Sequence, residues 1–175
     1  MLGYLLSRHP RPGHAPGVLV DPAPQHLIGS LTIYRVDYGS DVSARERDVT
    51  DIESALAERA HPGHRLTWLH FEGDVSAAQL ARIGQVFDLH PLALEDVLNH
   101  GQRPKLDNYR HSLFITLALP YMNAEVLVFQ QVSIFIGDDF VLSFHAGDHD
   151  LFAAVRERIH GALGRIAHAE TDYLG

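Results

Sequence analysis

The sequence contains no cysteine among its 175 residues. This absence excludes a disulfide framework, a thiolate metal site and a cysteine nucleophile, and it fits a reducing compartment. Positive charge is also scarce, because 14 Lys and Arg residues stand against 22 Asp and Glu residues and give a net charge of −8 with neutral histidines. That balance opposes binding to nucleic acid or to anionic lipid, so we expect no nucleic-acid partner.

Long apolar runs are missing as well. Crossing a bilayer takes roughly 18 apolar residues. The best candidate, residues 125–144, is interrupted by Gln130, Gln131, Asp138 and Asp139. The first residues also lack the basic start and long apolar core of a signal peptide. We therefore expect the chain as given to be soluble and cytoplasmic.

The sequence lacks the common catalytic signatures. It contains no Gly-x-Ser-x-Gly, no Gly-x-x-x-x-Gly-Lys-Ser/Thr, no Gly-x-Gly-x-x-Gly and no His-Glu-x-x-His. A hydrolase that uses the carboxylates of Asp148 or Asp150 is supported only by the general observation that acidic loops sometimes carry catalysis. We therefore predict that the chain is not an enzyme.

The residues that are present are typical of one globular domain. Hydrophobic residues make up 46% of the chain and charged residues 21%, which is enough for a single core at this length. Residues 1–25 contain five prolines, which break helix and strand hydrogen bonding. We interpret residues 1–25 as an irregular lead-in and residues 26–170 as a single domain.

Hydrophobic periodicity and helix caps predict the elements of that domain. Capping boxes at Thr50 with Glu53 and at Ser76 with Gln79 mark two helix starts. The expected helices are 50–60, 76–87, 91–99 and one that follows Asp150, and the expected strands are 27–36, 65–71, 112–119, 125–136 and 140–144. This order mixes crossovers with hairpins. It predicts an α/β fold of the αβα sandwich type, with a mixed parallel and antiparallel sheet between helical layers.

Histidine is the one unusually common residue, with 13 copies. Apart from His70 in an expected strand, the histidines are scattered through expected loops and helix ends. Zinc needs three or four converging ligands, so this scatter favours surface histidines over a single zinc site.

Two acidic features are candidate metal sites. Glu95 and Asp96 are adjacent on the helix 91–99, where carboxylates can hold Mg²⁺ through one or two direct bonds. Neighbouring helical residues point about 100° apart, so a solvated acidic face is the competing interpretation. The second feature is a loop whose possible zinc ligands are His145, Asp148, His149 and Asp150. A polar turn in which Asp150 caps the next helix explains most of that loop without an ion.

Several motifs in order resemble the cytoplasmic domain of the CorA family of magnesium and divalent-cation transporters. The most specific are His-Pro-Leu-Ala-Leu-Glu-Asp at 90–96 and Gln-Arg-Pro-Lys at 102–105. Trp68-Leu69-His70, the run 131–137, Val-Arg-Glu-Arg-Ile at 155–159 and Asp172-Tyr173-Leu174 agree with the same family. The part before Trp68 carries no such motif.

The resemblance implies a regulatory funnel domain of a homopentameric channel, followed in the family by a long stalk helix and two membrane spans. The family's Gly-Met-Asn pore signature does not occur here. We therefore expect a fragment whose residues 171–175 begin the stalk helix. The full-length protein would lie on the cytoplasmic face of the membrane, attached through C-terminal helices outside this fragment, and the fragment alone would be a monomer or weak dimer.

Carried over from the family, Asp96 falls on an acidic position that binds regulatory metal between subunits, with Glu95 beside it as a secondary contributor. The resemblance thus implies weak, regulatory Mg²⁺ at Asp96. Two departures leave the ion open: Gln130 stands where the family commonly has Glu, and His145-Ala146 replaces a stretch that often contains an acid. Zn²⁺ or Co²⁺ is the alternative, because the family includes a zinc-transporting branch and imidazole suits softer ions. A free-standing metal-binding or scaffold domain without a pore is the other alternative.

Overall fold

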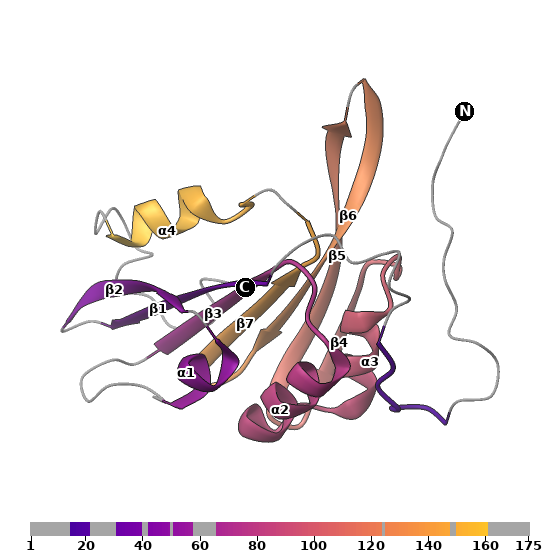
Figure 1. The fold of residues 1–175 in the computed structure, drawn as a ribbon, viewed down its shortest axis with the longest axis horizontal. Coiled ribbons are helices and arrows are strands. Elements are labelled where there is room, and N and C mark those ends of the chain that lie inside the picture. Colours follow the sequence, from indigo (N-terminus) through magenta and orange to yellow (C-terminus); the bar gives the residue numbers. More distant parts are fainter. Residues whose placement is uncertain are drawn as a thin grey trace.

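The computed structural model describes residues 15–21, 31–39, 42–49, 51–57, 66–123, 125–147 and 150–160. These residues form one mixed sheet of seven strands with helices on both faces (Figure 1). In chain order the elements are β1 (Thr32–Gly39), β2 (Val42–Val49), α1 (Ile52–Ala57), β3 (Leu66–Glu72), α2 (Ala77–Phe87), α3 (Pro91–Leu98), β4 (Lys105–Tyr109), β5 (Ser112–Asn123), β6 (Val126–Ile136), β7 (Phe140–His145) and α4 (Ala153–His160). None of the described helices is long and apolar enough to span a bilayer.

The strands follow the order β2-β1-β3-β7-β6-β5-β4 across the sheet. The central pair, β3 and β7, is parallel, and the other neighbouring strands are antiparallel. A parallel pair requires a long crossover, and here α2, α3 and three strands lie between its two members in the chain. The prediction of an α/β fold with a mixed sheet is confirmed.

Each face of the sheet buries its own apolar cluster. Helices α1, α2 and α3 lie on one face, where Leu80, Ile83 and Phe114 are fully buried (Figure 1). Helix α4 lies on the opposite face, where Ile159 packs with Trp68. The strands of the sheet centre alternate between these two clusters because successive side chains of a strand point to opposite faces.

Helix α2 begins where its capping box was predicted. The Ser76 hydroxyl accepts a hydrogen bond from the backbone N–H of Gln79 at 3.3 Å, and the Gln79 side chain accepts one from the backbone N–H of Ser76 at 2.9 Å. Two turns later Gly84 faces α3, where a Cβ atom would lie 2.4 Å from Cδ1 of Leu94. The missing side chain at Gly84 therefore allows the close contact between α2 and α3.

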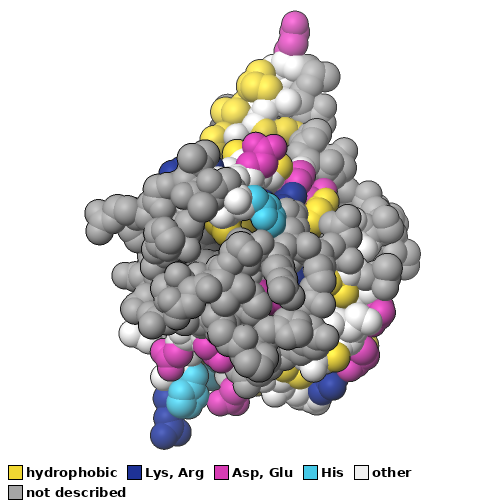
Figure 2. All heavy atoms as spheres, turned by 90° about the vertical axis from the view of Figure 1, so that its left-hand side faces the viewer, with side chains coloured by type: hydrophobic (Ala, Val, Ile, Leu, Met, Phe, Trp, Pro, Cys, Tyr) yellow, Lys and Arg dark blue, Asp and Glu magenta, His cyan; other side chains and the backbone are white. Residues whose placement is uncertain are grey.

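Strands β5 and β6 form a long hairpin that extends beyond the rest of the sheet (Figure 1). Its outer part carries exposed hydrophobic side chains, which gather on the projecting tip in Figure 2: Met122, Val126, Leu127 and Phe129. Strand β5 continues to Asn123, so the predicted end at residue 119 was wrong.

Two strands were not predicted, and both are edge strands. β2 has the sequence VSARERDV and pairs with β1, while β4 has the sequence KLDNY and pairs with β5. An edge strand is held mainly by backbone hydrogen bonds to one neighbour, so it need not carry a strong apolar pattern. The periodicity argument consequently missed both.

Other boundaries also differ from the prediction. The first described strand begins at Thr32 instead of residue 27, and residues 22–30 lie outside the described residues. Thr50 likewise lies outside them, while the Asp51 carboxylate accepts a hydrogen bond from the backbone N–H of Ser54 at 2.8 Å and caps α1. The predicted extension of the last helix towards Ile166 falls outside the described residues.

Candidate metal sites

The first candidate site is the acidic pair on α3. Pro91 occupies the first turn, and the N-cap side chain of His90 accepts a hydrogen bond from the backbone N–H of Leu92 at 3.3 Å. The apolar side chains of α3 face the core (Ala93, Leu94, Val97 and Leu98), and this leaves Glu95 and Asp96 half-buried at the surface. Both carboxylates therefore reach solvent, because the apolar side chains of α3 occupy the positions that face the core.

Each of these carboxylates has its own protein partner. Oε2 of Glu95 accepts a hydrogen bond of 2.7 Å from the backbone N–H of Gly17, so it holds the lead-in segment 15–21 against α3. Oδ2 of Asp96 is 2.7 Å from Nζ of Lys105 on β4. The two side chains therefore point to different neighbours and do not converge on one position.

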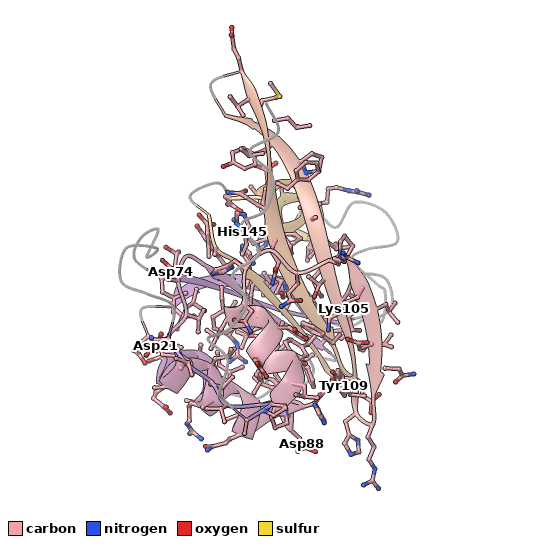
Figure 3. The ribbon with its side chains drawn as sticks, turned by 90° about the vertical axis from the view of Figure 1, so that its right-hand side faces the viewer. Asp21, Asp74, Asp88, Lys105, Tyr109 and His145 are labelled. Carbon is pink, nitrogen blue, oxygen red and sulfur yellow. The ribbon has the colours of Figure 1, made fainter. Side chains whose placement is uncertain are left out.

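Lys105 lies between two carboxylates. Its Nζ is also 3.0 Å from Oδ2 of Asp107, and Figure 3 shows Lys105 near Tyr109 on the same strand. Burial alone would lower the pKa of Lys105, but the hydrogen bonds and charges of Asp96 and Asp107 outweigh it and raise that pKa. The ammonium group is therefore a permanent counter-ion of Asp96 at neutral pH.

The C-terminal end of α3 is fixed to the sheet by Gln131 of β6. Its Nε2 donates to the backbone carbonyl of Asp96 at 2.9 Å, and its Oε1 accepts from the backbone N–H of Gln102 at 2.9 Å. This side chain connects the helix end, the following loop and the sheet. The backbone at Asp96 is therefore held in place by the sheet.

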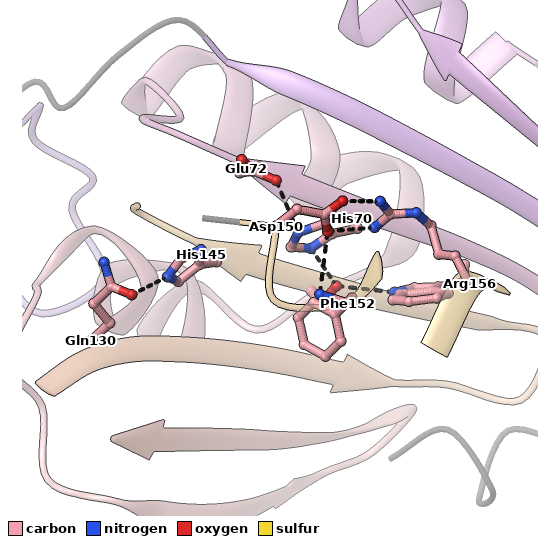
Figure 4. Close-up of polar contacts among 9 residues, drawn as sticks. His70, Glu72, Gln130, His145, Asp150, Phe152 and Arg156 are labelled. Atoms are coloured by element: carbon pink, nitrogen blue, oxygen red, sulfur yellow. Dashed lines mark hydrogen bonds and ion pairs between the residues drawn. The ribbon is translucent and has the colours of Figure 1, made fainter. Parts of the chain in front are cut away.

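A second candidate site lies on the opposite face, beneath α4. His70 and Glu72 are two residues apart on β3, so their side chains share a face, and Asp150 approaches them from the loop before α4 (Figure 4). One ligand atom from each of the three residues lies within 4.8 Å of the others. His70 Nε2 is 4.0 Å from Oε2 of Glu72. Within the described residues this is the only group of three such side chains with that spacing.

The His70 ring is almost completely buried, with 1% of the residue exposed. Its Nδ1 is 2.9 Å from the hydroxyl of Ser143 on β7, and that hydroxyl accepts a hydrogen bond of 3.0 Å from Nε1 of Trp68. Burial lowers the pKa of His70 to about 3, and the charges of Arg156 and His145 contribute to this effect. The ring is consequently neutral at physiological pH.

Asp150 is held by α4. Both of its carboxylate oxygens pair with the Arg156 guanidinium, whose Nη1 is 2.9 Å from Oδ1. Oδ1 also accepts a hydrogen bond of 3.3 Å from the backbone N–H of Phe152. Burial would raise the pKa of Asp150, but the hydrogen bond and charge of Arg156 outweigh it and lower that pKa. Arg156 in turn lies over the Tyr34 ring at 4.0 Å, which fixes α4 to the sheet.

Comparison with known proteins gives the family. Residues 63–170, more than half of the chain, match the model of the CorA-like Mg²⁺ transporter protein. The chain belongs to the CorA-like family. The resemblance that rests on the motifs after Trp68 is thereby confirmed.

A curated relative agrees with this assignment. The cobalt/magnesium transport protein CorA of Thermotoga maritima is 36% identical over 149 residues, which cover 81% of this chain and 42% of that protein. The chain therefore spans less than half the length of this CorA relative.

Two solved structures share the fold. The soluble domain of CorA from Methanocaldococcus jannaschii has a TM-score of 0.54 at 16% identity, over 78% of this chain and 50% of that chain. The cytoplasmic domain of ZntB from Vibrio parahaemolyticus has a TM-score of 0.57 at 14% identity, over 78% of this chain and 52% of that chain. At these identities the likeness supports the CorA fold alone.

The predicted ligands of the CorA domain have different outcomes. Glu95 and Asp96 are adjacent on α3 but bind separate partners. His145 is buried on β7, where its Nε2 is 2.9 Å from Oε1 of Gln130, and it does not join the three-residue group. The other members of the predicted loop site, Asp148 and His149, lie outside the described residues, whereas Asp150 joins the group beneath α4.

His70 and Glu72 were not predicted as ligands. The available signal was their spacing, because a His and a Glu two residues apart on a strand share one face. The sequence does not indicate that Asp150, nearly 80 residues later, meets them there.

Proposed function

We propose that this chain is the cytoplasmic metal-sensing and gating domain of a CorA-type divalent-cation transporter that carries Mg²⁺, with Co²⁺ and Ni²⁺ as further cargo. The family match over residues 63–170 and the cobalt/magnesium transport relative support the proposal. The parent protein would be a homopentamer attached to the membrane through helices outside this chain.

The observation that carries the sensing role is the position of the Asp96 carboxylate. One of its oxygens pairs with Lys105. The side chain is nevertheless 17% exposed, so it is accessible at the surface. Mg²⁺ binds proteins through one or two carboxylates and keeps several waters, so a single carboxylate on each side of a subunit interface suits a weak regulatory site. The residues of this chain suit one side of such a site, where Asp96 would be the ligand and Glu95 would contribute charge nearby.

Electrostatics then connect ion binding to gating. Carboxylates of neighbouring subunits repel each other, and a bound dication removes that repulsion, so the symmetric ring is stabilised when the ion is plentiful. Gln131 holds the backbone carbonyl of Asp96, which transmits the change to β6. The domain would close the transporter at high cytoplasmic Mg²⁺ and release it at low Mg²⁺.

The test is Mg²⁺ feedback in the longest gene product that contains this domain. Asp96→Asn keeps the shape of the side chain and removes its charge, so inhibition of uptake by internal Mg²⁺ should be lost. Asp107→Asn is the matched control, because Asp107 also pairs with Lys105 but lies on β4. Equal Mg²⁺ feedback in Asp96→Asn and Asp107→Asn would contradict the proposed role of Asp96.

The zinc-transporting branch is the second candidate. The observation that favours it is the imidazole content of this chain, with 13 histidines, because imidazole prefers Zn²⁺ to Mg²⁺. Uptake of Zn²⁺, Co²⁺ and Mg²⁺ measured side by side distinguishes the two branches. A free-standing domain is the remaining alternative, and the gene sequence beyond residue 175 tests it: two apolar spans with Gly-Met-Asn support the transporter, and a stop codon rejects it.

A further inference from the structure

We propose that His70, Glu72 and Asp150 form a binding site for one transition-metal dication, with Zn²⁺ as the best-matched ion. The site lies between β3 and the start of α4, on the opposite face of the sheet from Asp96 (Figure 4). It goes beyond the proposed transport function, because it belongs to the domain itself and needs neither a partner subunit nor a pore.

The first argument is the spacing of the donor atoms. One nitrogen and two carboxylate oxygens lie within 4.8 Å of one another, and the His70–Glu72 pair is 4.0 Å apart. A tetrahedral zinc ion with bonds of about 2.0 Å separates its ligand atoms by roughly 3.3 Å. Metal binding would therefore draw the donor atoms closer together than they lie in the structure.

The second argument is the orientation of the buried imidazole. Its Nδ1 is engaged by Ser143, so Nε2 is the nitrogen that points towards Glu72. Only 1% of the His70 side chain is exposed, and Nε2 has no hydrogen-bond partner among the described residues. A buried nitrogen without a partner costs free energy, and a metal ion at this position would satisfy it.

The surroundings of His70 match those of a metal-bound histidine. Histidines that bind metals are usually oriented by a hydrogen bond at the other ring nitrogen, and Ser143 supplies that bond here. Ser143 is itself held by the indole N–H of Trp68, and the Phe152 ring packs edge-on against the imidazole with 4.8 Å between centroids. The ring is therefore fixed before any ion arrives.

The donor oxygens and their exposure complete the argument. The carboxylates of Glu72 and Asp150 supply oxygen donors beside the neutral imidazole, and both oxygens of Asp150 already pair with Arg156. A carboxylate has about four lone-pair positions, so Asp150 can bind a metal while it keeps Arg156. The side chains of Asp150 and Glu72 are 31% and 14% exposed, so the cluster borders the surface although Oε2 of Glu72 is itself buried.

The donor set also indicates which ion binds. Mg²⁺ takes oxygen ligands and keeps its waters, whereas Zn²⁺ and Co²⁺ accept the mixed nitrogen and oxygen donors of one imidazole with two carboxylates. The site should therefore discriminate against Mg²⁺, in contrast to the all-oxygen chemistry proposed at Asp96.

The experiment is calorimetric titration of the whole chain with Zn²⁺ in the presence of excess Mg²⁺, followed by titration with Co²⁺ in a visible spectrometer. Glu72→Gln removes a ligand charge while keeping the shape of the side chain, and His70→Gln removes the imidazole. The matched control is His111→Gln, because His111 lies 3.9 Å from Asp88 in a similar but exposed His–carboxylate pair.

We expect one Zn²⁺ equivalent that excess Mg²⁺ does not displace. Its affinity should fall at least tenfold in Glu72→Gln and be unchanged in His111→Gln, and the intense Co²⁺ bands of a low-coordinate site should disappear in parallel. If His70→Gln does not fold, Glu72→Gln alone still decides the outcome. Unchanged Zn²⁺ affinity in folded Glu72→Gln, or no Zn²⁺ binding by the parent chain, would overturn the proposal and leave His70, Glu72 and Asp150 as a structural cluster.

Discussion

The buried imidazole of His70 makes a specific prediction about stability and pH. Its pKa is lowered to about 3 in the folded protein, mainly by burial and then by the charge of Arg156. Among the groups that face the ring, His145 adds to this effect and Asp150 opposes it, and Glu72 lies beside it. In the unfolded chain the same imidazole titrates near 6.5, at about the ordinary value.

The unfolded state therefore binds more protons than the folded state between these two values. Stability contributed by His70 is fully present above a pH of about 6.5 and falls as the pH decreases, by about 1.4 kcal/mol per unit. At pH 5 the expected loss is about 2 kcal/mol relative to pH 8. This figure depends little on the folded pKa, because pH 5 lies well above it.

The assay is guanidinium unfolding of the wild type and of His70→Gln at pH 8 and pH 5, with a chelator present to remove metal ions. The single tryptophan, Trp68, is buried with 3% exposure and reports unfolding by fluorescence. The stability difference between the two proteins should shrink by about 2 kcal/mol at pH 5. Other titrating groups cancel in that difference.

His111→Gln serves as the control, since the side chain of His111 is 56% exposed. NMR of the wild-type His70 ring at pH 5 gives an independent measurement that needs no variant, and the ring should still be neutral. A stability difference that is the same at pH 8 and pH 5 would refute the argument from burial.

Three further substitutions test the packing of the domain by chemical denaturation. Gly84→Val should cost about 1–3 kcal/mol, because its side chain overpacks against Leu94, whose Cδ1 would lie 2.4 Å from a Cβ at Gly84; no loss would mean that α3 shifts freely. Ser76→Ala removes the α2 cap and should cost about 1 kcal/mol, and an unchanged midpoint would show that the cap is dispensable. Arg35→Met removes the 2.8 Å guanidinium contact of the buried Asp37 carboxylate and should cost about 3–5 kcal/mol; a loss below about 1 kcal/mol would show that the remaining partners of Asp37, which include the Thr67 hydroxyl, compensate that charge.

The elements that the sequence predicted correctly are set by local interactions, whereas the elements that it missed depend on contacts with distant segments. Helices α2 and α3 were predictable because their caps and apolar spacing lie within a dozen residues. The edge strands β2 and β4 were not, because an edge strand is placed largely by backbone hydrogen bonds to one neighbouring strand.

The same distinction applies to the candidate sites. The sequence identified Asp96 through a contiguous motif, but its partner Lys105 could be assigned only when β4 was placed beside α3. Asp150 was a candidate by residue type. Its proximity to His70 and Glu72 arises only because the loop before α4 packs against β3.

Chain composition and local pattern alone establish a cysteine-free, acidic α/β domain with CorA motifs and an acidic pair on one helix. Local hydrogen bonds and side-chain periodicity are encoded over short distances, so they can be read from the residues in order. Only the tertiary structure pairs Asp96 with Lys105 and leaves Nε2 of His70 buried beside two carboxylates. It also places these two sites on opposite faces of the sheet. Those properties depend on burial and on contacts between distant segments, which arise only when the parallel pair β3 and β7 forms the centre of the sheet.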